Sequence, residues 1–289
     1  MSPRYSTIHF PLRSRGKWEK TETALDLNLE GKKAIVSGGS RGIGKAIAFQ
    51  LAREGCDLAI GARSEGPLQA TADEIAKATG RKVFGFTVNT LDVGSIKAFV
   101  KQCADALGGA DIVINSAARV GGAAGDIEAI DELEILRDFE EKAIGYLRVA
   151  REALPYMKQN GWGRIINISG LAGRRPGTGM SGGARNASTV VMTKAWANAL
   201  GKYGINVNAI YPGLTVTEAT YDRWAEQART QNTTVEALKQ KTDEGTLLKH
   251  ATTAEDIGYV AAFLCSPLAI GITGEAIAVA GGQGEDVHF

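Results

Sequence analysis

The sequence has few of the residues that build disulfide frameworks and metal centres. Only three of its 289 residues are cysteines and three are histidines. The cysteines are odd in number and far apart, which argues against a disulfide framework and favours small buried residues in a reducing compartment. The histidines fit neither a catalytic triad nor a metal-ligand spacing, so we expect no metal site. These residues are Cys56, Cys103, Cys265, His9, His250 and His288.

An excess of one charge and a long apolar run are also missing. The 33 lysines and arginines nearly balance the 32 aspartates and glutamates, which leaves a net charge of +1. Such a chain has no basic field to hold nucleic acid or an anionic membrane. No apolar run approaches the ~18 residues of a membrane-spanning helix, and the N-terminus has no hydrophobic signal-peptide core. We therefore expect a cytoplasmic globular protein with no nucleic-acid or membrane partner.

Glycine, in contrast, is abundant, with 36 residues. This share is well above the ~7% of an average protein. It is not low-complexity filler, because 44% of the chain is hydrophobic and no repeated unit is present. Glycine at this level hints at a fold in which the backbone must approach something closely.

Residues 1–28 have no helical or strand periodicity and mix basic with aromatic side chains. We predict that they form an N-terminal arm outside the folded domain. Two interpretations stay open: a disordered or surface-wrapping arm, and an arm that grips a neighbouring subunit.

From residue 29 onward, short apolar and β-branched runs alternate with longer amphipathic stretches. The runs span 34–39, 57–62, 82–88, 111–117, 164–169, 205–211 and 275–282. Helices are predicted after residue 42 and near 66–79, 94–107, 133–158, 187–202 and 254–265. Continuous apolar strands separated by helices are typical of a parallel sheet that is covered on both faces. We predict an α/β fold: a single Rossmann-type doubly wound domain over 29–289, with about seven parallel strands, helices on both faces, and a substrate lid at 214–250.

A glycine-rich loop at 37–44 follows the first predicted strand and opens the first predicted helix. Its glycines allow a tight turn and a close approach of the backbone to a pyrophosphate, and the helix N-terminus adds oriented N–H groups. The second strand ends with Arg63 and has no acid there. Because two cations, Arg41 and Arg63, are then expected near the adenosine ribose, a 2′-phosphate fits better than a 2′-hydroxyl. We predict NADP(H) in preference to NAD(H).

The loop resembles the Thr-Gly-x-x-x-Gly-x-Gly signature of the short-chain dehydrogenase/reductase family, with Ser37 in place of the threonine. The segments 115–118, 163–169, 204–213 and 272–282 are similar to further motifs of that family, in the same order. The resemblance implies cofactor contacts from these segments and from Asn89, where the family usually has an aspartate. The predicted cofactor-binding residues are Gly38, Ser40, Arg41, Gly42, Ile43, Gly44, Arg63, Asn89, Thr90, Asn115, Ala117, Pro212, Gly213, Thr215 and Thr217.

The family's catalytic residues, a serine, a tyrosine, a lysine four residues later and an asparagine on the preceding helix, are not matched. The serine and tyrosine positions correspond to Gly170 and Gly182, and no tyrosine lies between Tyr156 and Tyr203. The lysine position holds an asparagine and the asparagine position holds a lysine, so these two side chains have exchanged places. The candidate catalytic residues are Lys142, Asn186 and Ser169, although Lys142 also suits an ordinary charged helix face and Ser169 a strand end.

Three functions are compatible with this sequence. The first is an NADP(H)-linked oxidoreductase of a small carbonyl or alcohol with an atypical acid. The second is a non-redox enzyme, such as a dehydratase, isomerase or C–C lyase, that uses Lys142 as a base or nucleophile. The third is a non-catalytic NADP(H)-sensing protein. Arg185 would suit an anionic small-molecule substrate or a solvent-exposed position, and the family resemblance implies a homodimer or homotetramer.

Overall fold

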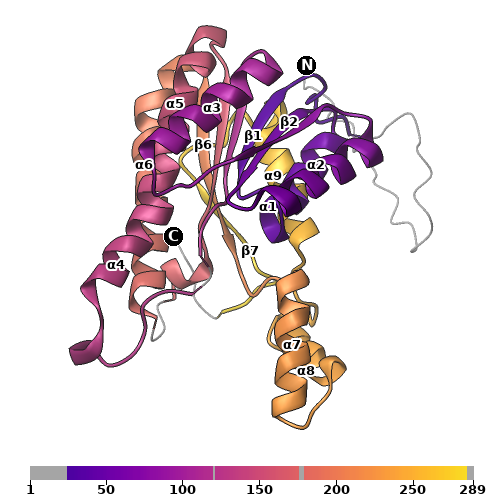
Figure 1. Cartoon of the computed structure of the whole chain (residues 1–289), viewed down its shortest axis with the longest axis vertical. Coiled ribbons are helices and arrows are strands. Elements are labelled where there is room, and N and C mark those ends of the chain that lie inside the picture. The colour runs from indigo at the N-terminus through magenta and orange to yellow at the C-terminus, as the bar shows by residue number, and fades with distance from the viewer. Residues whose placement is uncertain (1–24, 120, 176–178, 285–289) are drawn as a thin grey trace, which may run out of the picture.

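The computed structural model describes residues 25–119, 121–175 and 179–284. Its centre is a seven-stranded sheet with the order β3-β2-β1-β4-β5-β6-β7, and all neighbouring strands are parallel (Figure 1). This confirms the predicted doubly wound fold. The strands are β1 (Lys33–Ser37), β2 (Asp57–Ala62), β3 (Val83–Thr87), β4 (Ile112–Asn115), β5 (Gly163–Ile168), β6 (Ile205–Pro212) and β7 (Ala276–Val279).

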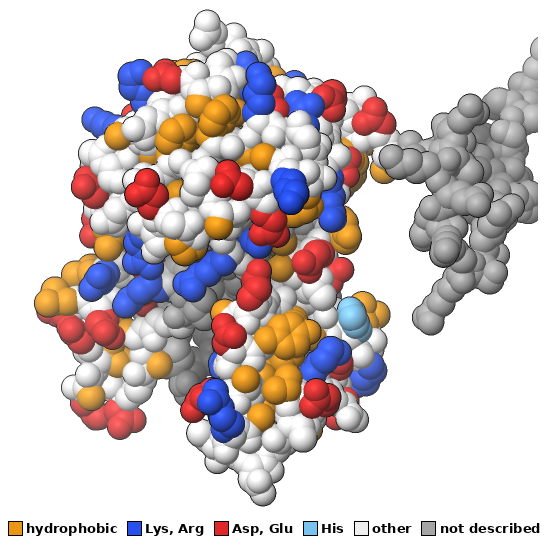
Figure 2. Space-filling view, turned by 45° about the vertical axis from the view of Figure 1, so that its right-hand side comes forward, with side chains coloured by type: hydrophobic (Ala, Val, Ile, Leu, Met, Phe, Trp, Pro, Cys, Tyr) orange, Lys and Arg blue, Asp and Glu red, His pale blue; other side chains and the backbone are white. Residues whose placement is uncertain are grey.

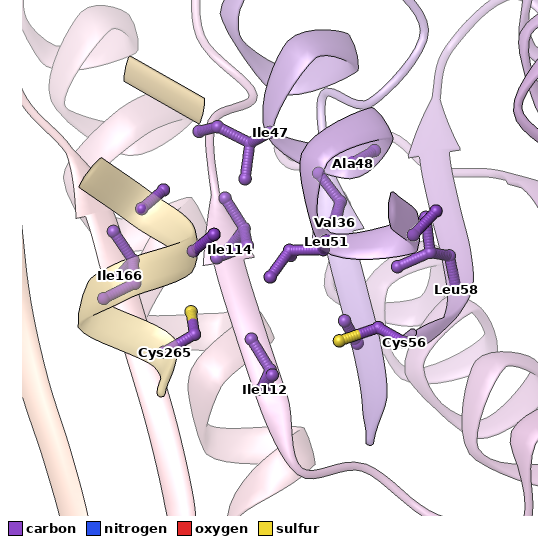
Figure 3. Close-up of a cluster of buried hydrophobic side chains, with 14 of the residues drawn as sticks. Val36, Ile47, Ala48, Leu51, Cys56, Leu58, Ile112, Ile114, Ile166 and Cys265 are labelled. Carbon is purple, nitrogen blue, oxygen red and sulfur yellow. The ribbon is translucent and has the colours of Figure 1, made fainter. Parts of the chain in front are cut away.

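Helices cover both faces of the sheet, and each face has its own apolar core. One core packs α1 (Gly42–Arg53), α2 (Glu65–Thr79) and α9 (Ala254–Cys265) on the sheet. Figure 3 shows side chains of α1 and α9 that meet those of the strands in this core. The other core packs α3 (Val93–Leu107), α5 (Gly145–Asn160) and α6 (Met180–Leu200). Successive strand residues point to opposite faces, so strands that are buried on both sides need continuous apolar runs. Each fully buried Ile or Leu contributes about 1.5–3 kcal/mol to this packing.

The predicted helix at 133–158 is interrupted. It consists of α4 (Glu132–Phe139), a π-helical turn at Glu140–Ile144, and α5. A π turn adds one residue to a helical turn and is common at functional sites. The turn carries Glu141 and Lys142, whose side chains are both buried.

The helix predicted near 187–202 begins earlier, at Met180. Ser181, Gly182 and Gly183 are weak helix formers, so local propensity argued against this extra length. Contacts from outside the helix override that propensity, because Ser181 and Arg185 both bind Asp138 on α4.

The polar segment after β6 forms a helical hairpin of α7 (Glu218–Thr230) and α8 (Val235–Glu244) at the carboxyl edge of the sheet (Figure 1). In the space-filling view this hairpin makes a separate lobe below the body of the domain (Figure 2). The predicted arm at 1–28 lies outside the described residues, apart from 25–28. Within the described ranges, no helix combines the length and the apolar character that crossing a membrane requires.

Candidate cofactor and active site

A crevice is expected where neighbouring strands lead away in opposite directions, and in this sheet that point lies between β1 and β4. The loops after these strands pack tightly against each other. Gly38 has a φ of +78°, and a Cβ on it would lie 2.7 Å from the Ala117 nitrogen. A Cβ on Gly44 would lie 2.1 Å from the Gly38 carbonyl oxygen. Both positions therefore require glycine, which explains the loop sequence.

The first turn of α1 binds an anionic side chain. Helix α1 begins at Gly42, and the preceding residue, Arg41, makes no side-chain cap. The Gly42 amide instead donates to a carboxylate oxygen of Glu218 on α7, at 3.2 Å. A helix N-terminus attracts negative charge through its unpaired N–H groups and its dipole. The loop therefore fits an anionic group such as a pyrophosphate.

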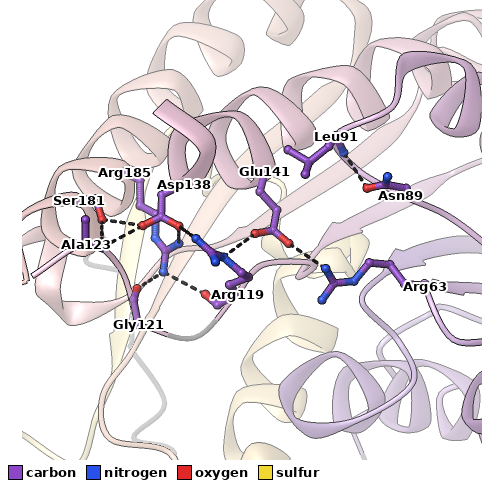
Figure 4. A network of polar contacts seen from close by, with 10 residues as sticks. All are labelled: Arg63, Asn89, Leu91, Arg119, Gly121, Ala123, Asp138, Glu141, Ser181 and Arg185. Carbon is purple, nitrogen blue, oxygen red and sulfur yellow. Dashed lines mark hydrogen bonds and ion pairs between the residues drawn. The ribbon is translucent and has the colours of Figure 1, made fainter. Parts of the chain in front are cut away.

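The predicted adenosine end of the site contains an acid that sequence reasoning missed. Arg41 is exposed, and the side chain of Arg63, just after β2, is 62% exposed. Glu141 reaches Arg63 from the π turn, with 3.7 Å between Oε1 and Nη1 (Figure 4). The prediction of a 2′-phosphate rested on a second strand that ends at Arg63 with no acid of its own. Only a contact between distant segments brings Glu141 there, so no local signal could have found it.

The remaining predicted cofactor residues divide into loop and interior positions. Asn115 is fully buried and donates to the Asn167 side chain at 2.9 Å and to the Tyr146 carbonyl at 3.3 Å. Its amide therefore connects β4 with β5 and α5. Asn89 accepts from the Leu91 amide at 3.2 Å. The other predicted positions lie in loops at the carboxyl edge or at the ends of adjoining elements, and are Ser40, Ile43, Thr90, Ala117, Pro212, Gly213, Thr215 and Thr217.

Two of the three candidate catalytic side chains meet directly. The Lys142 ammonium nitrogen donates to Asn186 Oδ1 at 2.6 Å and to the Ser169 carbonyl oxygen at 2.9 Å. The Ser169 hydroxyl points elsewhere and donates to the Asn186 carbonyl at 2.8 Å. Lys142 and Asn186 are thus hydrogen-bonded to each other through their side chains, whereas Ser169 binds the lysine through its backbone carbonyl.

Burial strongly perturbs the lysine. Lys142 is 6% exposed, and burial lowers its pKa from 10.5 to about 7, with a smaller contribution from the positive charge of Arg185. Desolvation disfavours the charged form of an amine, which explains the direction. A pKa near neutrality is the property that a general acid or base requires.

Neighbouring groups pack against Gly170 and Gly182, the two glycines that the family resemblance predicts at the serine and tyrosine positions. A Cβ on Gly170 would lie 2.8 Å from the Asn186 amide nitrogen, so that amide takes the place of a side chain. At the second position, a Cβ on Gly182 would lie 3.4 Å from the Gly121 carbonyl oxygen. The loop that carries Gly121 is thus in van der Waals contact with the start of α6.

A charged network holds this loop and α6 together (Figure 4). Asp138 is fully buried; it accepts from Ser181 at 2.6 Å and from Arg119 at 2.9 Å, and lies 3.2 Å from Arg185. Burial alone would raise the pKa of Asp138, but the Ser181 and Arg119 hydrogen bonds and the charge of Arg185 lower it. Arg185 also donates to the carbonyls of Arg119 and Gly121.

This network corrects the expectation for Arg185. The residue is 4% exposed and neither faces solvent nor offers a free guanidinium to an anionic substrate. Its charge is balanced by Asp138 on another helix. Buried arginines need such a partner, which a single sequence does not reveal.

Known proteins resemble this chain over most of its length. A family described as enoyl-(acyl carrier protein) reductase matches residues 38–283. The 3-oxoacyl-(acyl-carrier-protein) reductase FabG of Aquifex aeolicus is 33% identical over 265 residues, which cover 90% of this chain and 100% of that protein. The NADPH-dependent reductase BacG of Bacillus subtilis is 31% identical over 258 residues, covering 87% and 97%.

A solved structure has a closely similar fold. L-sorbose reductase from Gluconobacter frateurii, complexed with NADPH and L-sorbose, has a TM-score of 0.85 and 28% identity, and the match covers 90% of this chain and 98% of that chain. The sheet order, the glycine loop and these relatives agree with one another. The chain belongs to the short-chain dehydrogenase/reductase family.

Proposed function

We propose that this protein is an NADP(H)-dependent oxidoreductase that interconverts a small carbonyl compound and its alcohol, with Lys142 as the proton carrier. The observation that carries the proposal is the buried Lys142–Asn186 hydrogen bond of 2.6 Å beside the cofactor crevice. The relatives named above include two reductases whose names or complexes specify NADPH. Family membership supports the reaction class, and the site supports the identity of the acid.

The cofactor would be held by residues of the crevice. The glycine loop and the α1 N-terminus would bind the pyrophosphate, and Arg41 and Arg63 would pair with a 2′-phosphate. NADPH, when bound, supplies a hydride to a carbonyl carbon. The protein's part is to place the substrate and to supply the proton that the oxygen then needs.

Lys142 has the donors for that task. A protonated lysine has three N–H donors, of which two bind Asn186 and the Ser169 carbonyl. The third N–H would donate to the substrate oxygen and pass its proton as the alkoxide develops. The remaining neutral amine keeps its two hydrogen bonds and regains a proton from solvent. A pKa of about 7 places both protonation states within reach at neutral pH.

NADPH oxidation against a panel of small ketones and aldehydes tests this function. Replacing the proton carrier, as in Lys142→Met, should lower kcat/KM about 10²–10⁴-fold. Activity should also fall above pH 7, where the lysine loses its proton. Lys158→Met is the matched control, because Lys158 is an exposed lysine on α5. Unchanged turnover in Lys142→Met would remove Lys142 from the mechanism.

The cofactor preference has its own test. NADPH should raise the melting temperature more than NADH at equal concentration, because a ligand that binds only the folded state stabilises it according to its affinity. Equal shifts would contradict the role of Arg41 and Arg63. We also expect residues 214–250 to close over the substrate. The chain should form a homodimer or homotetramer, and light scattering measures this oligomeric state.

The buried amine also favours a second candidate, a non-redox reaction through Lys142. A lysine with a pKa of about 7 is substantially neutral and nucleophilic at physiological pH. Its nitrogen would attack a substrate carbonyl, and loss of water would leave an imine. Borohydride reduction should then leave a stable substrate adduct on Lys142, detectable by peptide mass spectrometry. An adduct without NADPH turnover would favour this second function.

A further inference from the structure

Glu141 is a buried carboxylate whose hydrogen bonds are incomplete. Its side chain is 6% exposed, and Oε2 accepts no hydrogen bond within the described part of the chain. Two guanidinium groups flank it (Figure 4). The distances are 3.7 Å from Oε1 to Arg63 Nη1 and 3.4 Å from Oε2 to Arg119 Nε. Both exceed the 2.7–2.9 Å of a well-formed charge-assisted hydrogen bond.

The two arginines differ in their freedom to leave this contact. The Arg63 side chain is 62% exposed at the end of β2, so little packing holds it against Glu141. The Arg119 side chain is 39% exposed and also binds the buried Asp138 at 2.9 Å. If Arg63 turned towards another anion, Glu141 would keep Arg119 as its counter-ion. A buried carboxylate needs at least one such partner.

Arg63 is also the cation that the proposed function assigns to the cofactor's 2′-phosphate. A phosphate monoester offers close to two negative charges and several acceptor oxygens, so it competes effectively for a guanidinium. While Arg63 stays near Glu141, however, the carboxylate neutralises part of its charge. The same carboxylate repels any phosphate that approaches Arg63.

We propose that Glu141 sets the cofactor selectivity of this protein by competing with the 2′-phosphate for Arg63. The proposal rests on the proposed function, because it assumes that NADP(H) binds in this crevice. Glu141 would then weaken the binding of 2′-phosphorylated ligands and leave NAD(H), which has a 2′-hydroxyl, unaffected. Because the Arg63 half of the pair is 62% exposed and the Arg63–Glu141 distance is long, we expect the pair to be worth no more than a surface ion pair, about 0.2–1 kcal/mol, which corresponds to at most about a fivefold change in affinity.

Titration calorimetry with adenosine 2′,5′-bisphosphate and 5′-AMP tests the proposal without turnover. In Glu141→Gln, the bisphosphate should bind about two- to fivefold more tightly, whereas the Kd for 5′-AMP should stay unchanged. NADPH and NADH should show the same contrast. Glu140→Gln is the matched control, because Glu140 is the adjacent acid, is 46% exposed, and pairs with Arg148 instead. That substitution should change neither Kd.

A double-mutant cycle separates the pair from its surroundings. Arg63→Gln alone should weaken the binding of the bisphosphate. In the double variant, adding Glu141→Gln to Arg63→Gln should not restore any of that affinity. The ratio of the two Kd values is an internal control, since a loosened or partly unfolded variant would bind both ligands more weakly. Circular dichroism and the melting temperature check that each variant is folded.

Two results would overturn the proposal. If Glu141→Gln weakens the binding of both ligands equally, Glu141 contacts a group that both ligands share, such as the ribose. If the folded variant leaves both Kd values unchanged, Glu141 does not compete for Arg63. In either case NADPH binding by the natural protein still supports the proposed function. Failure of the natural protein to bind NADPH or the bisphosphate would overturn both proposals together.

Discussion

The buried Lys142 should make the stability of this protein depend on pH in an unusual direction. Its pKa is about 7 in the folded chain and 10.5 for an ordinary lysine. Between these two values the unfolded state binds more protons than the folded state. Stability therefore rises as the pH increases from 7 towards 10.5, because the penalty for burying a charged amine disappears. An apolar residue of similar length, as in Lys142→Met, removes this dependence.

The size of the effect follows from the two pKa values. Each tenfold difference in proton affinity is worth ~1.4 kcal/mol, so burying the amine costs about 5 kcal/mol at pH 6, where it stays charged, and about 2 kcal/mol at pH 9, where it must release its proton on folding. The substitution also leaves Asn186 Oδ1 and the Ser169 carbonyl without their donor. That loss costs about 1–3 kcal/mol for each group and does not vary with pH. The change with pH therefore reports the lysine alone.

Urea denaturation at pH 6, 7.5 and 9 measures this prediction. The free energy of unfolding of the natural protein should rise by about 3 kcal/mol relative to that of Lys142→Met between the first and the last pH. All other titrating groups are common to both proteins and cancel in the difference. A difference that stays constant over this range would mean that Lys142 titrates like an exposed lysine, and the argument for its role as a general acid would fail.

Two further predictions concern the packing around the site. Gly170→Ser should cost about 1–3 kcal/mol of stability in urea denaturation, because its Cβ would lie 2.8 Å from the Asn186 amide nitrogen and the hydrogen bond to Lys142 holds that amide in place. Gly66→Ser, where no atom lies within 4 Å of the added Cβ, is the control, and equal losses in the two variants would contradict this explanation. Asp138→Asn should cost about 3–5 kcal/mol by calorimetry, because it leaves a buried arginine without its counter-ion. The control is Asp105→Asn, because Asp105 forms an exposed ion pair with Lys101; it should change stability by less than about 1 kcal/mol. An equally small effect of Asp138→Asn would refute the structural role of the network.

The sequence by itself determined the fold and the location of the crevice. Continuous apolar strands and amphipathic helices alternate with the periods that a covered parallel sheet requires, and these patterns are local. The glycine loop could also be predicted, because its glycines stand between a predicted strand and a predicted helix. The structure gives the physical reason for them, since a side chain on Gly38 or Gly44 would collide with the backbone. Comparison with the family's motif spacing also singled out Lys142 and Asn186, whose side chains lie 2.6 Å apart in the structure.

Only the tertiary structure decided how charges are partnered around that crevice. Arg185 is paired with Asp138, and Glu141 reaches Arg63 from the π turn between α4 and α5. The early start of α6 has the same origin, since contacts with Asp138 stabilise a turn that its glycines disfavour. Hydrophobic periodicity is a property of neighbouring residues. An ion pair between distant segments depends on how the elements pack, so one sequence reveals the charges and not their partners.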